Sequence, residues 1–181
     1  MAKPLISREQ IFDEALRILD DQGAQGLTAR NLAARLKCST STLYQQVGPR
    51  EQMLHGLVAH AFAQAELSPG QMTSWPDAVR SWCAQVRSTL LSRPELAGLM
   101  TLPDSEILVR FAGRLTRALR EHGFAEGDAV HIAATLNHLA TSMVMGEIKA
   151  GTAWNFAPIF DTAIEWAIAG IERSSASPST Q

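Results

Sequence analysis

GLTARNLAARLKCSTSTLYQQVGPR, residues 26–50, is the stretch that decides the fold. It contains two short segments with apolar residues at helical spacing, joined by a tight turn at residues 37–39. Thr28 is a typical N-cap for the first segment, and Ser39 or Thr40 is one for the second. Gly48 and Pro49 end the second segment and favour a new helix from Pro49. Two short helices joined in this way predict a helix-turn-helix, whose second helix lies in the DNA major groove.

The second of these helices has distinct apolar and polar faces. Leu43 and Val47 are expected to point inward, together with Leu36 of the first helix. The polar side chains of this stretch then point outward: Thr40, Ser41, Gln45 and Gln46. Glutamine can bond adenine through two atoms, and serine or threonine can bond several bases. Thr28, Tyr44 and Arg50 stand where a phosphate contact is useful, and Thr28 and Arg50 lie at helix N-termini, which favour anions.

The charge of this stretch differs from that of the chain. The 181 residues carry a formal charge of -2, which is close to neutral. Residues 24–50 contain four basic side chains (Arg30, Arg35, Lys37 and Arg50) and no acidic one. A basic module on an acidic body is typical of a nucleic-acid-binding protein. Arg35 and Lys37 could equally be solvated surface residues.

Three motifs resemble the tetracycline-repressor (TetR) family: GLTARNLA at 26–33, STSTLYQQV at 39–47 and PREQML at 49–54. The resemblance covers about residues 7–60. It implies base-reading roles for Arg30, Thr40, Ser41, Thr42 and Gln45, and phosphate contacts for Thr28, Tyr44, Gln46 and Arg50. The family usually has glycine where this chain has Lys37, and an aromatic residue or histidine often follows the tyrosine, where this chain has Gln45 and Gln46. The second departure bears on the operator sequence that is read.

The rest of the chain is expected to be helical as well. Ser7 and Gln10 form a capping box for a first helix that ends at Gly23. A fourth helix should run to about residue 66, before the linker at 68–70. Five more are expected at 74–91, 92–102, 104–123, 128–149 and 156–172. We therefore predict an all-α fold of nine helices, with a DNA-binding head at 1–48, a connecting helix at 49–67, a ligand-binding and dimerisation domain at 68–173 and a disordered tail at 174–181.

The last helix is apolar over more than one face, so a monomer would expose part of it. In the resembled family the last two helices form a four-helix bundle across a homodimer. The resemblance and the apolar breadth together predict a dimer interface. Its candidate residues are Phe156, Ile159, Ala163, Trp166 and Gly170.

Several apolar residues and two polar ones could line a cavity for a small-molecule effector. They are Trp82, Met100, Phe111, Leu115, Asn137 and Thr141. Asn137 and Thr141 are four residues apart on an otherwise apolar helix, so they either bond across the dimer or orient a ligand. For each of the six residues alone, ordinary core packing is an equally good interpretation.

Other classes of function lack a supporting pattern. The sequence has no nucleophile elbow, paired-carboxylate motif, HExxH motif or phosphate-binding glycine loop. Cys38 and Cys83 lack metal-ligand spacing, and the pair His131 and His138 has no completing ligand. We expect no cofactor, no metal, no signal peptide and no membrane span, and hence a cytoplasmic protein. Four arginines between residues 110 and 120 could form a second DNA patch, although a solvated face is the simpler interpretation.

The sequence thus predicts a ligand-responsive DNA-binding regulator that is not an enzyme. We expect it to be a repressor, since repression is usual in the resembled family, and to leave a near-palindromic operator when a small apolar molecule binds. The partners expected are double-stranded operator DNA, a second copy of the chain and the effector. The alternatives are a helical protein-binding adaptor and an all-α enzyme.

Overall fold

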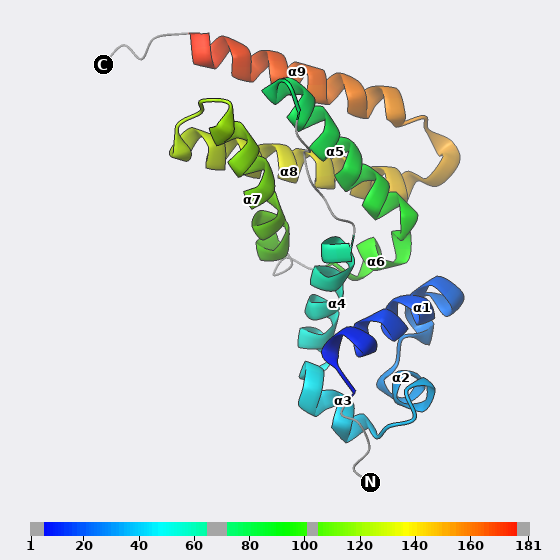
Figure 1. Cartoon of the computed structure of the whole chain (residues 1–181). Helices are drawn as coiled ribbons and strands as arrows, with labels where there is room; N and C mark the ends of the chain where they lie inside the picture. Colours follow the sequence, from blue (N-terminus) through cyan, green and yellow to red (C-terminus); the bar gives the residue numbers. More distant parts are fainter. Residues whose placement is uncertain (1–5, 65–71, 101–104, 177–181) are drawn as a thin grey trace. The chain divides into compact units, whose positions relative to one another are not determined.

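The computed structural model describes residues 6–64, 72–100 and 105–176. Within these ranges all regular structure is helical, as predicted (Figure 1). The helices are α1 (Arg8–Gly26), α2 (Ala29–Arg35), α3 (Thr40–Val47), α4 (Arg50–Gln64), α5 (Trp75–Ser92), α6 (Pro94–Leu99), α7 (Ser105–Glu121), α8 (Glu126–Ala150) and α9 (Ala157–Ala176). A short 3-10 turn, η2 (Gly151–Ala153), joins α8 to α9.

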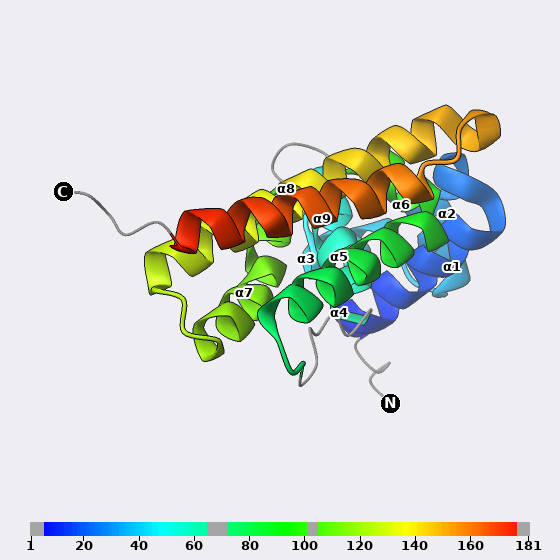
Figure 2. The same cartoon turned by 90° about the horizontal axis from the view of Figure 1, so that it is seen from above.

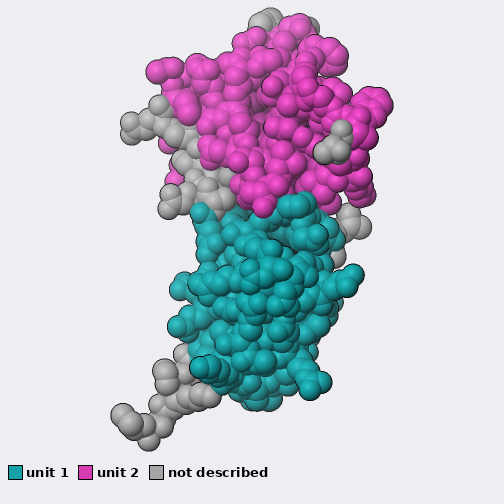
Figure 3. Space-filling view, turned by 90° about the vertical axis from the view of Figure 1, so that its right-hand side faces the viewer, with its two compact units in different colours: residues 1–66, 93–107 teal, residues 67–92, 108–181 magenta. Residues whose placement is uncertain are grey.

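The chain forms two compact units, coloured separately in Figure 3. Unit 1 contains residues 1–66 and 93–107, and unit 2 contains residues 67–92 and 108–181. Unit 1 therefore adds α6 to the predicted head and connecting helix. The domain boundaries at residues 48, 67 and 173 stay predictions.

Unit 1 is built on α1, which contacts α2, α3, α4 and α6. The predicted capping box is present: Gln10 N–H donates to Ser7 Oγ at 3.1 Å, and Ser7 N–H donates to Gln10 Oε1 at 3.0 Å. The prediction that helix α1 ends at Gly23 is wrong. The helix is interrupted at Gly23 (φ 68°, ψ −173°) and then resumes to Gly26. Glu95 of α6 accepts a hydrogen bond from Ala24 N–H at 3.4 Å, just after the break. A distant side chain thus caps the resumed turn.

The turn between α2 and α3 closes with a Schellman motif. Cys38 N–H donates to the Ala33 carbonyl at 3.0 Å, and Lys37 N–H donates to the Ala34 carbonyl at 3.1 Å. Lys37 adopts φ 53°, the left-handed conformation that glycine takes most easily. The geometry that usually calls for glycine is therefore held here by a lysine.

Unit 2 is built on α5, α8 and α9, which lie side by side (Figures 1 and 2). Arg80 Nε donates to Glu165 Oε1 at 2.6 Å, joining α5 to α9. Arg87 Nε donates to Glu147 Oε2 at 2.9 Å, joining α5 to α8. Ion pairs at the helix surface thus fix the register of helices whose facing sides are apolar.

The ends of the helices in unit 2 differ slightly from prediction. Ser74 caps α5 as expected, with Asp77 N–H donating to Ser74 Oγ at 3.3 Å. Helix α8 begins at Glu126 rather than Asp128, without a side-chain cap. Helix α9 continues to Ala176, so residues 174–176 of the predicted tail at 174–181 are helical. The predicted cap at Asp104 and the rest of that tail lie outside the described residues. Within the described ranges, no helix is both long and apolar enough to cross a bilayer.

Candidate nucleic-acid interface and effector site

Helix α3 has one buried apolar side and one exposed polar side. Leu43 and Val47 are buried, while Thr40, Ser41 and Gln45 are exposed. Ser39 is the N-cap: its Oγ accepts from Thr42 N–H at 3.0 Å and lies 2.8 Å from Thr42 Oγ1. Of the five residues for which the resemblance implies base reading, Thr42 therefore has its hydroxyl already engaged within the helix cap. The other four, Arg30 of α2 included, lie on the surface.

The residues expected at phosphates lie around this surface. Thr28 caps α2, its Oγ1 accepting from Asn31 N–H at 3.1 Å, and its hydroxyl hydrogen stays available for a further bond. Tyr44 is 45% exposed, which excludes full burial in the core. Gln46 is half-buried. Arg50 is exposed, and its Nη1 donates to the Leu27 carbonyl at 3.0 Å.

One cation of the basic stretch has a structural role that sequence reasoning missed. Arg35 Nη1 donates to Glu14 Oε1 at 3.2 Å, and Arg35 Nη2 donates to Asp21 Oδ2 at 3.1 Å. These hydrogen bonds, led by the one to Glu14, raise the pKa of the Arg35 guanidinium above its ordinary value. Both acids lie on α1, so Arg35 joins α2 to α1 and contributes less positive potential than its sequence position suggests.

Comparisons with known proteins show which proteins the chain is similar to. No family model matches the chain. An HTH-type transcriptional regulator of Saccharopolyspora erythraea is 28% identical over 155 residues, covering 84% of this chain and 64% of that protein. The class D tetracycline repressor protein of Escherichia coli is 28% identical over 144 residues, covering 77% of this chain and 66% of that protein. The chain is similar in sequence to proteins of the TetR family.

A solved structure has the same fold. A TetR variant from Acinetobacter baumannii AYE, crystallised with minocycline, superposes with a TM-score of 0.75 at 24% identity. The match covers 93% of this chain and 97% of that chain, so the likeness includes residues of both units. The chain spans slightly less than two thirds of the length of the two curated relatives.

Three of the six candidate effector residues each have a buried polar atom without a partner. Trp82 and Asn137 are buried, and Thr141 is half-buried with a buried hydroxyl. The indole Nε1 of Trp82, Oδ1 of Asn137 and Oγ1 of Thr141 have no hydrogen-bond partner within the described structure. Such groups are rare, because desolvating a polar atom without a partner is costly.

The other three candidate effector residues have no such unpaired buried atom among the described residues. Leu115 of α7 is buried in unit 2. Met100 is the C-cap of α6 and belongs to unit 1. The side chain of Phe111 lies outside the described residues.

Helix α9 carries an exposed apolar stripe. Phe160, Ile164 and Ile168 are buried, whereas Trp166 is 73% exposed and Ile159 is 45% exposed. The half-buried residues of the predicted interface, namely Phe156, Ala163 and Gly170, continue this stripe. Two further exposed side chains were missed by sequence reasoning: Val130 on α8 and Trp154 before α9. They were missed because each is a single apolar residue without a periodic pattern.

A hollow of about 600 Å³ lies between α8 and α9. Its wall includes Phe124, Ile132 and Leu136 on one side and Ala167 and Gly170 on the other. Asp128, His131, Thr135 and Ser174 also line it, so Gly170 of the predicted interface borders a hollow of mixed polar and apolar character.

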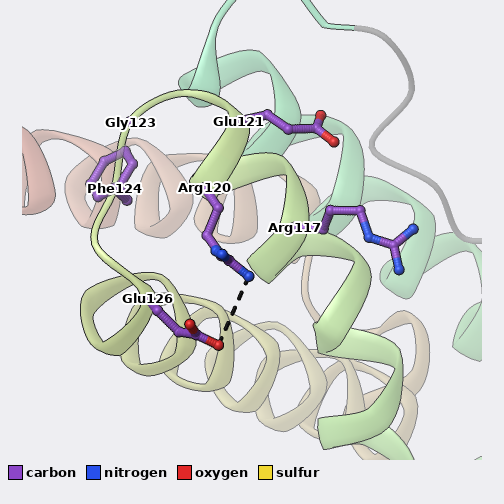
Figure 4. Close-up of a pocket in the computed structure, with 6 residues that line it drawn as sticks. All are labelled: Arg117, Arg120, Glu121, Gly123, Phe124 and Glu126. Carbon is purple, nitrogen blue, oxygen red and sulfur yellow. Dashed lines mark ion pairs between the residues drawn. The ribbon is translucent and has the colours of Figure 1, made fainter.

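Two arginines of α7, Arg117 and Arg120, line another hollow, at the turn into α8 (Figure 4). Arg117 and Arg120 are exposed, and Arg120 Nη1 lies 3.8 Å from Glu126 Oε1. The acidic Glu121 lines the same hollow. Acidic neighbours weaken the second DNA patch that the sequence left open. Within the described residues, no group of three His, Cys, Asp or Glu side chains could hold a metal ion.

Proposed function

We propose that this chain is a ligand-responsive DNA-binding transcriptional regulator, and a repressor. The observation that carries the proposal is the outward polar face of α3, with Thr40, Ser41 and Gln45 exposed above buried Leu43 and Val47. A helix held by apolar contacts, with exposed amide and hydroxyl groups, matches what a major-groove reader needs. The names of the similar proteins, a transcriptional regulator and a tetracycline repressor, support the same class of function.

The proposed active form is a homodimer that joins through α8 and α9. An interface of this kind would cover Trp166 and Ile159, whose exposure is costly in water. Two-fold symmetry then sets two copies of α3 about one DNA turn apart, roughly 34 Å, so that both enter successive major grooves. The operator should therefore be near-palindromic.

The proposed effector is a small, mostly apolar molecule bound in unit 2 near Trp82, Asn137 and Thr141. The minocycline complex of the similar A. baumannii protein supports a ligand site in this fold. The effector releases DNA by binding more tightly to a dimer state in which the spacing of the two α3 helices does not fit successive major grooves. The extent of release is set by the difference in its affinity for the two states. An adaptor or enzyme role has no comparable support in the names of the similar proteins. Burial raises the pKa of the Cys83 thiol to about 12, which leaves this thiol protonated and a poor nucleophile.

The experiment is a selection from random DNA duplexes by the full-length protein, followed by sequencing. The proposal predicts enrichment of one near-palindromic site, with affinity that falls steeply as salt rises. Recovery of no common sequence would contradict the proposal, and an asymmetric single half-site would contradict the symmetric dimer.

A further inference from the structure

Two fully buried polar groups and one buried hydroxyl lack partners, and each has a different hydrogen-bonding character. Trp82 is 0% exposed and Asn137 is 4% exposed. Trp82 Nε1 can only donate, Asn137 Oδ1 can only accept, and Thr141 Oγ1 can do either. Asn137 is the one buried polar residue among the residues described. Since native proteins pair nearly all such groups, three unpaired ones on two helices need an explanation.

The three groups lie within about one helical turn of one another on the same helix pair, α5 and α8. Arg80 pairs with Glu165, and Arg87 lies over the ring of Phe160 at 5.6 Å, so residue numbers on α9 fall as those on α5 rise. Helix α9 returns along α8 after the short turn η2, which makes α5 and α8 parallel (Figure 2).

The ion pair between Arg87 and Glu147 then sets the register of the parallel helices. Trp82 precedes Arg87 by the same five residues by which position 142 precedes Glu147. Trp82 is therefore nearly level with Thr141, and Asn137 precedes Thr141 by about one helical turn on the same face of α8. The three unpaired groups thus lie within about one helical turn of one another along the pair α5 and α8.

The surroundings of these three groups contain no buried charge. Within the described part of the chain no Asp, Glu, Lys or Arg is buried. The charged residues that border the helix pair, Arg87 with Glu147 and Arg80 with Glu165, neutralise each other at its surface. An ion entering beside Trp82 would lose its hydration without gaining a counter-charge, which costs far more than burying a neutral polar group.

We propose that the effector is an uncharged, mainly apolar molecule that offers an acceptor oxygen to Trp82 Nε1 and a hydroxyl or N–H donor to Asn137 Oδ1. The Thr141 hydroxyl completes whichever bond the ligand leaves open. This inference rests on the proposed function, since it assigns a chemistry to the effector of that regulator. Bound effector satisfies three groups that the free protein leaves unpaired, so its binding is favoured by hydrogen bonds as well as by apolar contact.

The stability of the free protein should reflect the unpaired groups even without a ligand. If the three groups serve binding, apolar replacements of similar shape remove an unpaired atom and stabilise the fold. Asn137→Leu and Thr141→Val should each raise the melting temperature by about 2–4 °C. Thr116→Val is the matched control, because the Thr116 hydroxyl donates to the Ala112 carbonyl at 3.1 Å and is already satisfied. That control should leave the melting temperature unchanged or lower it.

Binding is tested with three small probes on the full chain without DNA, at a pH where phenols are neutral. 4-Hydroxyacetophenone has a donor and an acceptor, 4-methoxyacetophenone has acceptors only, and 4-hydroxybenzoate is an anion. We expect the first to bind about tenfold more tightly than the second, and the anion not to bind. Asn137→Leu should abolish the preference for the first over the second. Thr116→Val should keep it.

Three results would overturn the inference. They are a lower melting temperature for Asn137→Leu and Thr141→Val, binding of the anion as tight as that of the neutral phenol, and no binding by either neutral probe. Failure of this inference can be distinguished from failure of the proposed function. Probe selectivity without duplex binding would refute only the regulator. Duplex binding without probe selectivity would refute only the uncharged, hydrogen-bonding effector.

Discussion

Arg50 Nη1 donates a hydrogen bond of 3.0 Å to the carbonyl oxygen of Leu27, tying the first turn of α4 to the residue before the Thr28 cap. One guanidinium N–H is thereby used inside unit 1. The remaining N–H groups of this exposed side chain can still meet a DNA phosphate. Arg50 thus combines a hydrogen bond that positions α4 with a proposed contact to a DNA phosphate.

This double role predicts how Arg50 variants behave. Arg50→Ala should weaken binding to all duplexes alike and lower the salt slope by about 1 per subunit, because one phosphate contact is lost. Arg50→Lys keeps the charge but has a single ammonium group, so it should keep most of the salt slope. Salt titrations of both variants on specific and scrambled duplexes check this. A loss confined to the specific duplex would assign Arg50 to base reading instead.

The left-handed Lys37 predicts a stabilising mutation. Glycine adopts φ 53° without the steric cost that a Cβ imposes, which is about 1 kcal/mol after glycine's own entropy cost is subtracted. Lys37→Gly should therefore raise the free energy of unfolding by about that amount. Lys37→Ala is the control, because it removes the side chain but keeps the Cβ. Denaturant titrations in which both variants behave alike would assign the effect to the lysine side chain rather than to the backbone.

Much of unit 1 could be predicted because its signals are local. The Ser7 capping box, the Ser39 cap and the inward Leu43 and Val47 each depend on residues within one or two turns. The interruption at Gly23 was recognised, but the return of the helix was not. That return involves Glu95, which is 71 positions from Ala24 in the sequence. A bond across that distance leaves no periodic signal.

The site shows the same contrast. The polar face of α3 follows from helical periodicity alone. The engagement of Arg35 with Glu14 and Asp21 does not, because it depends on how α2 packs against α1. Asn137 and Thr141 were noticed because they are polar residues in an apolar helix. Their lack of partners could only be seen once α5 and α8 were packed together.

The proposed dimer predicts a strong effect at Trp166. Trp166→Glu should yield monomers, because the interface would bury an unpaired carboxylate. Trp166→Phe keeps an apolar side chain and should stay dimeric. Sedimentation equilibrium of the two variants distinguishes these states. A dimer that survives Trp166→Glu would move the interface away from the exposed stripe of α9.

The contact between α1 and α4 predicts a pH effect on stability. His60 Nε2 lies 2.7 Å from Asp13 Oδ1. This hydrogen bond lowers the pKa of Asp13 below its ordinary value of 3.8. The carboxylate is therefore favoured in the folded state, and its contribution is present above pH 3.8 and lost as pH falls through the lowered pKa.

The test is Asp13→Asn, measured by denaturant titration between pH 7 and pH 2. The variant should be less stable than the wild type near neutral pH, and the difference should shrink in acid. Glu172→Gln changes an exposed carboxylate of α9 and serves as the control. A difference that stays constant down to pH 2 would show that the Asp13 charge does not contribute.

The central claim, that α3 reads DNA bases, is tested most directly by titrating Gln45→Ala against the selected site and a scrambled duplex. Gln45 is exposed, and Leu43 and Val47 already hold the helix, so the variant should fold normally. We predict that affinity for the selected site falls by about 1–3 kcal/mol, that preference relaxes at one position per half-site, and that scrambled DNA binds as before. Equal weakening on both duplexes, or no change on either, would contradict the account.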